Sequence, residues 1–577
     1  MAAQPHQTAK IGSGMLRHFQ GKSRLSIWSL VFIGIFAFLV FLPGRASTPP
    51  FDRDEPRYME ATAQMLESGN FVDVRFQDKP RYLQPAGIYW LEAASVALSG
   101  TLHDRAVWAY RVPSLLAMSA SVAITAWMAS VLFGASAGFF AAAMLMASVL
   151  VTAESRMGTI DSTLLFSVML AQVALVRVLL DREARRVTPI KTALLFWGAA
   201  GLGLMLKGPV ILIPTLGTVA AFCLTERKAD IWRRLRPGWG WIVSLVIVLP
   251  WCVAIGVVSH GAFFSNAVGT NFLGKVASGQ QAHGLPPGYH LLVFLLAFWP
   301  GSFFVVAALP VVWRNRLTPA VRYLLCWIIP HWLVFEAIAT KLPHYVLPTY
   351  PALAVLTAGA LAQGGPVWRN WPKALWARGA LCVYGGLWTI TGLALSVAGP
   401  VLLWRLEGQL SLPAFILAGG CGPLVIISAV MLVRSELIKA FVTSAICALL
   451  LYAGLFTVVV PKLHSIWLAP RLAALAETYR PCGDKTQVVS VSFSEPSLVF
   501  LLGGKVKLLG AQAAARLMHN DKACTVALVA QRDREAFVTA LGDDKADLLS
   551  RGMVTGLNYS NGHHLAISLY FLAQQSN

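Results

Sequence analysis

The chain contains four short clusters of charged and polar residues in surroundings that are otherwise strongly apolar. Two of these clusters are acidic. The first comprises Asp54, Glu55, Arg57 and Tyr58, and the second comprises Arg156 and Asp161. Two carboxylates from separate segments can converge on one reacting centre, as general-base catalysis requires. Each cluster also has a simpler interpretation: the first as a solvated loop, and the second as a structural Arg–Asp pair at a helix start.

The other two clusters are cationic. One is Lys207-Gly208-Pro209, between two apolar runs, where the lysine either snorkels to the membrane interface or binds an anion. The other comprises Lys341, His344 and Tyr345, just before a predicted helix. Helix N-termini carry positive partial charge and free N–H donors, so a phosphate could bind there. Helix capping is the alternative for this cluster.

The elements that must position these clusters are membrane helices. Of the 577 residues, 56% are hydrophobic and 13% charged, and the mean hydropathy is +0.62. Soluble proteins average roughly 45–50% apolar and about 25% charged residues, so an ordinary soluble enzyme is excluded. About thirteen apolar runs could each cross a bilayer, which predicts an α-helical polytopic membrane protein. Their centres lie near Ile35, Ser121, Ala143, Leu170, Ala199, Gly217, Val248, Phe298, Pro330, Val355, Gly392, Ala418 and Leu450.

The basic residues indicate the orientation of these spans. The formal net charge is +20, and alternate threading of the spans places most of the loop cations on one face. They are Arg182, Arg185, Arg186, Lys191, Arg227, Lys228, Arg233, Arg234, Arg236, Arg314, Arg316, Arg322, Arg369, Lys373, Arg378, Arg434 and Lys439. By the positive-inside rule this face is cytoplasmic, so the positive charge reflects topology and does not indicate nucleic-acid binding. All four clusters fall on the opposite face.

The predicted organisation has three parts. Residues 1–25 form a basic cytoplasmic N-terminus, residues 26–463 form the membrane domain, and residues 464–577 form a small α/β domain on the non-cytoplasmic side. The first external loop, residues 45–110, contains Arg81 and Tyr82. Within it, residues 62–66 and 88–98 are amphipathic and are expected to lie on the membrane surface as helices.

The C-terminal segment changes character from apolar runs to short alternating elements. Residues 487–493, 498–502, 506–509 and 525–530 are β-prone, and residues 470–479 and 532–541 have helical patterns. Cys482 and Cys524 are the only cysteines of this segment, and in an oxidising compartment they are expected to form a disulfide. No Cys/His spacing supports a structural zinc site.

Taken in order, these motifs resemble those of a known enzyme family. The run from Asp54 to Tyr58, followed by Met65-Leu66-x-x-Gly69-Asn70-Phe71, is similar to the first-loop motif of the C-type, polyprenyl-phosphate-dependent glycosyltransferases. The segment Pro85-x-Gly87-Ile88-Tyr89-Trp90 resembles the same loop. The subgroup that the chain resembles contains the bacterial aminoarabinose (lipid A) transferases and the protein O-mannosyltransferases.

The resemblance implies an inverting glycosyltransferase in the bacterial inner membrane, with its active site and C-terminal domain in the periplasm. The donor would be a sugar on a polyprenyl phosphate, undecaprenyl phosphate in bacteria, and the acceptor lipid A or a related envelope glycolipid. No cofactor is expected, and a metal is neither implied nor excluded. By motif match, Asp54 is the first-loop catalytic carboxylate and Asp161 a second functional acid. The expected substrate-binding residues are Glu55, Arg57, Tyr58, Arg81, Tyr82, Lys207, Lys341, His344 and Tyr345.

One departure from the family concerns the donor phosphate. Members often carry a lysine directly before the proline of the Tyr-Trp segment, where this chain has Gln84-Pro85. Other cations, such as Lys79 or Arg81, or residues of the other loops must then bind the phosphate. Alternative functions are a protein O-glycosyltransferase, a membrane transporter with its site near the bilayer midplane, and a non-catalytic envelope scaffold.

Overall fold

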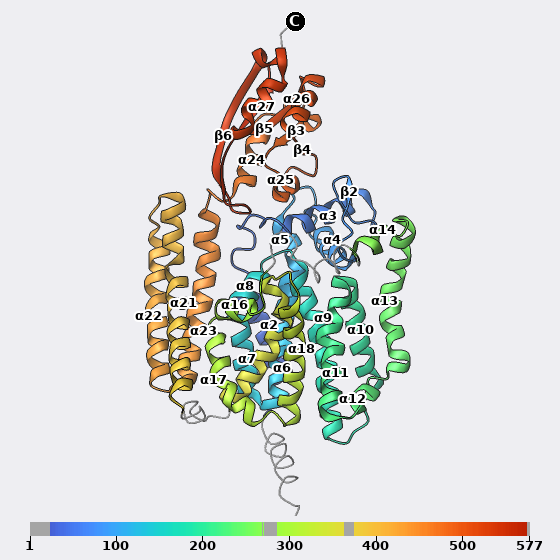
Figure 1. Cartoon of the computed structure of the whole chain (residues 1–577), viewed down its shortest axis with the longest axis vertical. Helices are drawn as coiled ribbons and strands as arrows, with labels where there is room; N and C mark the ends of the chain where they lie inside the picture. The colour runs from blue at the N-terminus through green and yellow to red at the C-terminus, as the bar shows by residue number, and fades with distance from the viewer. Residues whose placement is uncertain (1–22, 268, 270–284, 363–373, 574–577) are drawn as a thin grey trace, which may run out of the picture.

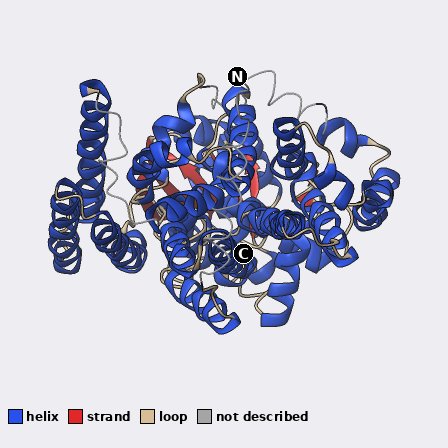
Figure 2. Cartoon of the chain, turned by 90° about the horizontal axis from the view of Figure 1, so that it is seen from below, coloured by secondary structure: helices blue, strands red, loops and turns tan. Residues whose placement is uncertain are grey.

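The structure is a computed structural model that describes residues 23–267, 269, 285–362 and 374–573. The basic residues expected before residue 23, together with Arg369 and Lys373, lie outside these ranges. The chain forms a broad layer of helices, with the first loop and a C-terminal α/β unit stacked on one end (Figure 1). Seen from the opposite end, the helices stand side by side in front of the strands (Figure 2).

The membrane character predicted from composition is confirmed. Nine of the described helices are long and apolar enough to cross a bilayer, or up to ten if one bent pair is a single span. They are α6 (Val112–Phe133), α9 (Ile160–Glu183), α10 to α11 (Ile190–Glu226), α13 (Pro237–Val258), α18 (Pro319–Ala337), η3 with α19 (Pro343–Ala362), α21 (Leu375–Glu407), α22 (Leu412–Val433) and α23 to η5 (Leu437–Lys462). Helices dominate because lipid offers no partner to backbone N–H and C=O groups.

Shorter apolar helices complete the layer. The pair α16 (Tyr289–Ala297) and α17 (Gly301–Arg314) is bent by 116° at its break, while α2 (Ile27–Phe41) and α7 (Ala135–Met146) are short. The long span after Ile190 divides into α10 (Ile190–Lys207), the turn η1 (Gly208–Ile211) and α11 (Leu212–Glu226). Each predicted span centre therefore falls in or beside an apolar helix.

The first loop folds into helices that stand directly on the membrane layer. They are α3 (Glu55–Ser68), α4 (Gly87–Ser99) and α5 (Val107–Tyr110), with a small hairpin of β1 (Arg75–Phe76) and β2 (Lys79–Pro80) between α3 and α4. Residues 62–66 and 88–98 lie within α3 and α4, as predicted. Gly87 begins α4 against the end of α10, where a Cβ atom would lie 2.5 Å from the carbonyl oxygen of Met205. A glycine in this motif is therefore required for the close approach of α4 to α10.

The C-terminal unit is a five-stranded sheet with helices on both faces. The strand order is β4-β3-β5-β7-β6, with β3 parallel to β4 and β5, and β7 antiparallel to β5 and β6. The strands are β3 (Gln487–Val491), β4 (Lys507–Leu509), β5 (Thr525–Ala530), β6 (Leu548–Asn558) and β7 (His563–Leu572). The helices are α24 (Leu468–Glu477), α25 (Pro496–Leu501), α26 (Ala511–Asn520) and α27 (Arg534–Ala540). Cys482 and Cys524 form the expected disulfide, with their Cα atoms 5.3 Å apart.

One prediction for this unit is wrong. Residues 498–502 were expected to form a strand, but they belong to α25 and its end. Pro496 occupies the first turn of α25, where proline favours a helix. Asp52 of the first loop then caps this turn, because its Oδ1 accepts from the Ser497 N–H at 2.9 Å and its Oδ2 from the Ser497 hydroxyl at 2.7 Å. A tertiary contact thus overrides the local β preference.

The same contact joins the C-terminal unit to the first loop. The hydroxyl of Tyr559 accepts from the Asp52 N–H at 2.7 Å, and Gln77 donates to the carbonyl oxygens of Gly504 and Val506 at 3.0 and 2.7 Å. Burial raises the pKa of the Asp52 carboxyl to about 7. The first loop is therefore held from above by the C-terminal unit and from below by the membrane helices.

Candidate active site

Asp54 lies at the start of α3, where the first loop faces the end of the membrane helices. Its side chain is 63% exposed, and its Oδ1 lies 3.6 Å from Nη1 of Arg57, one turn further along the helix. Its negative charge also acts on Arg81 and on the phenol of Tyr345, which belongs to another cluster. Asp54 is thus an accessible carboxylate with cations and a phenol around it.

Glu55, the next residue, is fully buried and holds the first loop in place. Its Oε1 accepts from Arg111 Nε at 2.7 Å and from the Gly158 N–H at 2.6 Å. Its Oε2 accepts from Arg111 Nη2 at 2.9 Å and from the Phe51 N–H at 2.7 Å. All four hydrogen bonds come from N–H groups of this chain, so both oxygens of Glu55 are occupied. Glu55 therefore supports the first loop, whereas the sequence predicted a contact with the substrate. Because Gly158 lies three residues before Asp161, this carboxylate connects the two acidic clusters.

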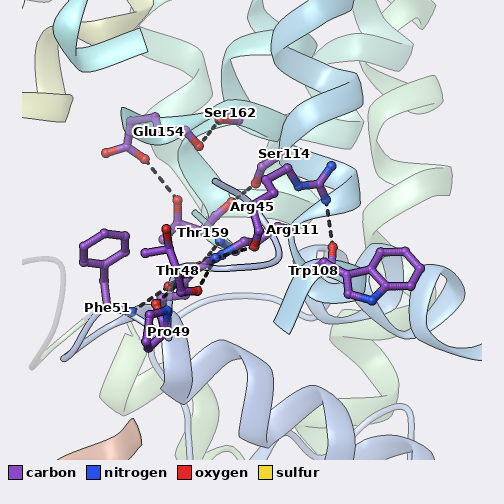
Figure 3. A network of polar contacts seen from close by, with 12 residues as sticks. Arg45, Thr48, Pro49, Phe51, Trp108, Arg111, Ser114, Glu154, Thr159 and Ser162 are labelled. Atoms are coloured by element: carbon purple, nitrogen blue, oxygen red, sulfur yellow. Dashed lines mark hydrogen bonds and ion pairs between the residues drawn. The ribbon is translucent and has the colours of Figure 1, made fainter. Parts of the chain in front are cut away.

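Arg111 completes this clamp, and Figure 3 shows it beside the loop residues Thr48, Pro49 and Phe51. The guanidinium is also fully buried, and its remaining N–H groups donate to backbone carbonyl oxygens of the loop. These acceptors are Arg45, Thr48 and Pro49, at 2.7, 2.8 and 3.0 Å. The loop that carries Asp54 is therefore fixed by a fully satisfied ion pair at its base.

Asp161 lies in the first turn of α9 and contacts two of the predicted cations. Its Oδ1 accepts from Nζ of Lys207 at 2.6 Å, and its Oδ2 lies 3.8 Å from Nε2 of His344. Lys207 is the last residue of α10, and its ammonium lies over the ring of Tyr345, 5.7 Å from the centroid. Three clusters that are distant in sequence therefore meet at one point.

Glu154 is a member of this site that the sequence reasoning missed. It ends the short helix α8 (Val149–Glu154), and its Oε1 lies 3.6 Å from Nδ1 of His344, so that the imidazole bridges Glu154 and Asp161. Its Oε2 accepts from the Thr159 hydroxyl at 3.0 Å (Figure 3). Burial and the negative charge of Asp161 raise the pKa of the Glu154 carboxyl above its usual range. The sequence signal that could have identified Glu154 is an acidic residue in an apolar segment, two residues before Arg156.

Arg81 and Tyr58 form a second cationic part of the site. The guanidinium of Arg81 lies over the ring of Tyr58, 5.1 Å from the centroid, and its Nε donates to the hydroxyl of Tyr89 at 3.0 Å. Gln84, at the position where the family often has lysine, donates to the Tyr58 hydroxyl. Among the described residues, no hydrogen bond engages the two terminal nitrogens of Arg81. These nitrogens are oriented by aromatic rings and can bind an anion.

Two expected site residues have other contacts. The hydroxyl of Tyr82 donates to Asp73 at 2.9 Å, and its ring packs edge-on against Phe263, which makes it part of the first-loop core. The buried Lys341 donates to carbonyl oxygens at the end of α18, those of Phe335, Glu336 and Ile338 at 3.4, 2.7 and 2.7 Å. The ammonium of Lys341 therefore caps the C-terminus of α18, whereas the sequence predicted that it binds phosphate beside the start of the next helix.

The site has no arrangement of metal ligands in the part of the chain that the structure describes. Within those residues, no group of three His, Cys, Asp or Glu side chains could hold a metal ion. What the geometry provides is one exposed carboxylate, a buried pair of carboxylates bridged by histidine, and cations from two directions. Such a site can activate an acceptor group and stabilise an anionic leaving group.

Comparison with known proteins supports the resemblance inferred from the motifs. Residues 27–262 match the family described as dolichyl-phosphate-mannose-protein mannosyltransferase. An undecaprenyl phosphate-α-4-amino-4-deoxy-L-arabinose arabinosyl transferase from Pseudomonas paraeruginosa is 29% identical over 350 residues, which cover 59% of this chain and 60% of the relative. The protein of the same name from Pectobacterium atrosepticum is 26% identical over 390 residues, 66% of each chain. The chain thus aligns with about 60 to 66% of the length of these curated relatives.

Solved structures extend the similarity to the whole fold. The crystal structure of ArnT from Cupriavidus metallidurans bound to undecaprenyl phosphate superimposes with a TM-score of 0.68 and 18% identity, covering 96% of this chain and 98% of that one. The apo structure gives a TM-score of 0.66 with 17% identity. The predicted resemblance to C-type glycosyltransferases is therefore confirmed, and this chain shares their fold.

Proposed function

We propose that the protein is an inverting glycosyltransferase that moves a sugar from undecaprenyl phosphate to an envelope acceptor, most simply aminoarabinose to lipid A. The observation that carries this proposal is that Asp161, Lys207 and His344 meet at one end of the membrane helices, where Glu55, next to Asp54, joins the first loop to Gly158, three residues before Asp161. The names of the curated relatives and the lipid in the ArnT crystal structure supply the donor.

The donor phosphate is assigned to the first-loop arginines. Lys207 is compensated by Asp161 at 2.6 Å, so less of its charge is available to a ligand. Arg81 is buried, and its terminal nitrogens have no hydrogen-bond partner within the described part of the chain, while Arg57 is partly exposed beside Asp54. Arg81 therefore replaces the lysine that this chain lacks at Gln84, with Tyr345 and Lys207 near the other side of the leaving group.

In the proposed reaction an acceptor oxygen attacks the anomeric carbon of the sugar. The bond between that carbon and the phosphate oxygen breaks with inversion, and undecaprenyl phosphate leaves with the bonding electron pair. If the acceptor is a hydroxyl, its proton passes to Asp54; if it is a phosphate oxyanion, no proton moves and Asp54 orients the sugar. The arginines stabilise the charge that develops on the leaving phosphate.

The arrangement in the membrane is part of the proposal. We place thirteen spans, with the site and residues 464–577 in the periplasm of the inner membrane, residues 1–25 in the cytoplasm and the membrane domain at 26–463. Support comes from the helices that match each predicted centre and from the arginines and lysines at the end opposite the site. Reporter domains fused after Arg236 should be cytoplasmic and those fused after Asn577 periplasmic; a cytoplasmic C-terminus would contradict the span count.

The catalytic test is the substitution Asp54→Asn, which keeps the shape of the side chain and removes its charge. Removal of a general base typically lowers the rate by 10²–10⁴-fold. Purified Asp54→Asn protein should lose sugar transfer and keep the wild-type melting temperature, because this exposed side chain contributes little to packing. Asp104→Asn, at an exposed carboxylate of the same loop, is the matched control and should remain active. Near-normal turnover of Asp54→Asn would refute the assignment.

The acceptor is decided by a separate experiment. Mass spectra of lipid A and of envelope glycoproteins are compared between cells with the gene and cells without it. Loss of an aminoarabinose mass from lipid A supports the proposal. Loss of sugar from proteins alone would instead favour a protein O-glycosyltransferase, the activity named in the matching family description.

A further inference from the structure

An apolar groove runs along the membrane domain at a distance from the active site. It lies between α2, α6, α9 and α10 and has a volume of about 750 Å³. On α6 its lining extends from Leu116 to Trp127, which is about 16 Å at ~1.5 Å per residue, or roughly the thickness of one leaflet. Several lining side chains, among them Ile27 and Ile35, are exposed at the surface of the structure. The groove therefore has the length and the polarity of a lipid acyl chain.

Arg177 is the one charged side chain that lines this groove among the described residues. It lies within the α9 span, and its guanidinium lies over the ring of Trp127, 5.8 Å from the centroid. No carboxylate of the described residues forms an ion pair with it, although arginines nearer the end of α9, such as Arg182, are paired. A charge at this depth is costly unless it reaches an anion or the interface, so an unpaired arginine here indicates a ligand.

The position of Arg177 separates this groove from the active site. Asp161 and Arg177 lie on the same helix, about 24 Å apart along its axis at ~1.5 Å per residue. Further cations, Arg24 before α2 and Lys191 at the start of α10, lie towards the same end of the membrane domain as Arg177. A lipid phosphate at Arg177 would thus be in the opposite leaflet from the proposed carrier phosphate.

We propose that this groove binds an anionic glycerophospholipid, with one acyl chain between α2, α6, α9 and α10 and its phosphate on Arg177. Trp127 supports the headgroup region, where tryptophan is favoured at membrane interfaces. The charge of Arg177 selects for lipids with net negative charge, because a zwitterionic headgroup carries its own compensating cation. The inference rests on the membrane fold and is independent of the transferase activity.

The test measures which lipids remain bound to the full-length protein in mild detergent, by native mass spectrometry with added phosphatidylglycerol or phosphatidylethanolamine. The wild type should retain phosphatidylglycerol preferentially. Arg177→Gln should weaken the retention of phosphatidylglycerol by on the order of tenfold or more, the effect of losing one charged contact. The retention of phosphatidylethanolamine should not change. Arg177→Lys should keep the preference because it keeps the charge. Arg316→Gln is the matched control, since Arg316 also lies over a tryptophan, Trp313, but outside the groove.

A second variant tests the groove itself and keeps the proposal falsifiable if Arg177→Gln folds poorly. Ala123→Phe fills the groove and leaves the arginine in place, so it should reduce retention of phosphatidylglycerol. Unchanged retention of phosphatidylglycerol in both Arg177→Gln and Ala123→Phe would overturn the proposal and mean that Arg177 only snorkels to the membrane interface. Displacement of phosphatidylglycerol by undecaprenyl phosphate would also overturn it, because the groove would then belong to the carrier.

Discussion

The clamp between Glu55 and Arg111 makes a sharp prediction for the substitution Glu55→Gln. A glutamine has one oxygen where glutamate has two, and all four donors around Glu55 are N–H groups. Whichever way the amide is turned, its NH2 group faces two donors, either Arg111 Nε with the Gly158 N–H or Arg111 Nη2 with the Phe51 N–H. The substitution therefore removes two hydrogen bonds, creates two donor–donor contacts and leaves Arg111 buried without a counter-charge.

The expected magnitude follows from the burial of both partners. Each side chain of the pair is 0% exposed, and removing one partner of a buried ion pair typically costs about 3–5 kcal/mol. Folded proteins are stable by only about 5–15 kcal/mol, so the melting temperature should fall clearly. If the first loop also shifts by about 1 Å, transfer should fall by roughly 10²-fold, because Asp54 would be misplaced relative to the Asp161 cluster.

The assay combines thermal unfolding of the purified protein with sugar transfer measured well below the new melting temperature. Donor affinity should change less than turnover, because Arg81 does not contact Glu55. Glu67→Gln is the matched control, since Glu67 lies on the same helix, is 46% exposed and pairs with an arginine that keeps a second partner, Glu60. It should cost at most about 1 kcal/mol. Wild-type stability and turnover in Glu55→Gln would refute the view that this pair positions the catalytic loop.

Three further predictions follow from other contacts. Arg81→Gln should weaken binding of undecaprenyl phosphate by roughly ten- to a hundredfold, the effect of losing one charged contact. Lys341→Gln should instead lower the melting temperature and leave the affinity for undecaprenyl phosphate near the wild-type value. Equal affinities in both variants would contradict the assignment of Arg81. Burial raises the pKa of the Asp52 carboxyl to about 7, so the folded protein binds more protons than the unfolded chain between about pH 4 and 7. Docking of the C-terminal unit should therefore weaken as pH rises through that range. Asp52→Asn should flatten this dependence in thermal unfolding, and an unchanged slope would argue against the buried carboxyl. Reduction of the disulfide between Cys482 and Cys524, which are 42 residues apart, should destabilise the C-terminal unit by about 4 kcal/mol. The measurement compares denaturant unfolding of the protein with and without reductant.

Gln84 stands where the resemblance to the glycosyltransferase family leads us to expect a lysine. Its amide donates to Tyr58, and the ring of Tyr58 supports Arg81, so the residue at the usual lysine position belongs to the support of another cation. In the proposed function, Arg81, three residues before Gln84, supplies the positive charge for the phosphate. A guanidinium can contact two phosphate oxygens at once, which an ammonium does less well.

Much of the fold could be predicted from local sequence. The apolar runs specify membrane helices because backbone groups in lipid can be satisfied only within the helix, whatever the neighbours are. The strand at residues 525–530 and the helical pattern at 470–479 also appear where they were expected. By contrast, β6 and β7 were missed and residues 498–502 were assigned to a strand, because sheet pairing and the cap from Asp52 depend on residues far away in the chain.

For the site, the sequence alone identified the residue types and the four clusters but could not assign their roles. Asp54, Asp161, Lys207 and His344 stood out because ionisable residues are rare next to membrane spans. Only the tertiary structure distinguishes Asp54, which is exposed, from Glu55, whose two oxygens are fully occupied by Arg111 and backbone N–H groups. Likewise, only the position of the α18 carbonyls reveals Lys341 as a helix cap. Burial and partner geometry decide whether a charge is available to a substrate, and neither is a local property of the sequence.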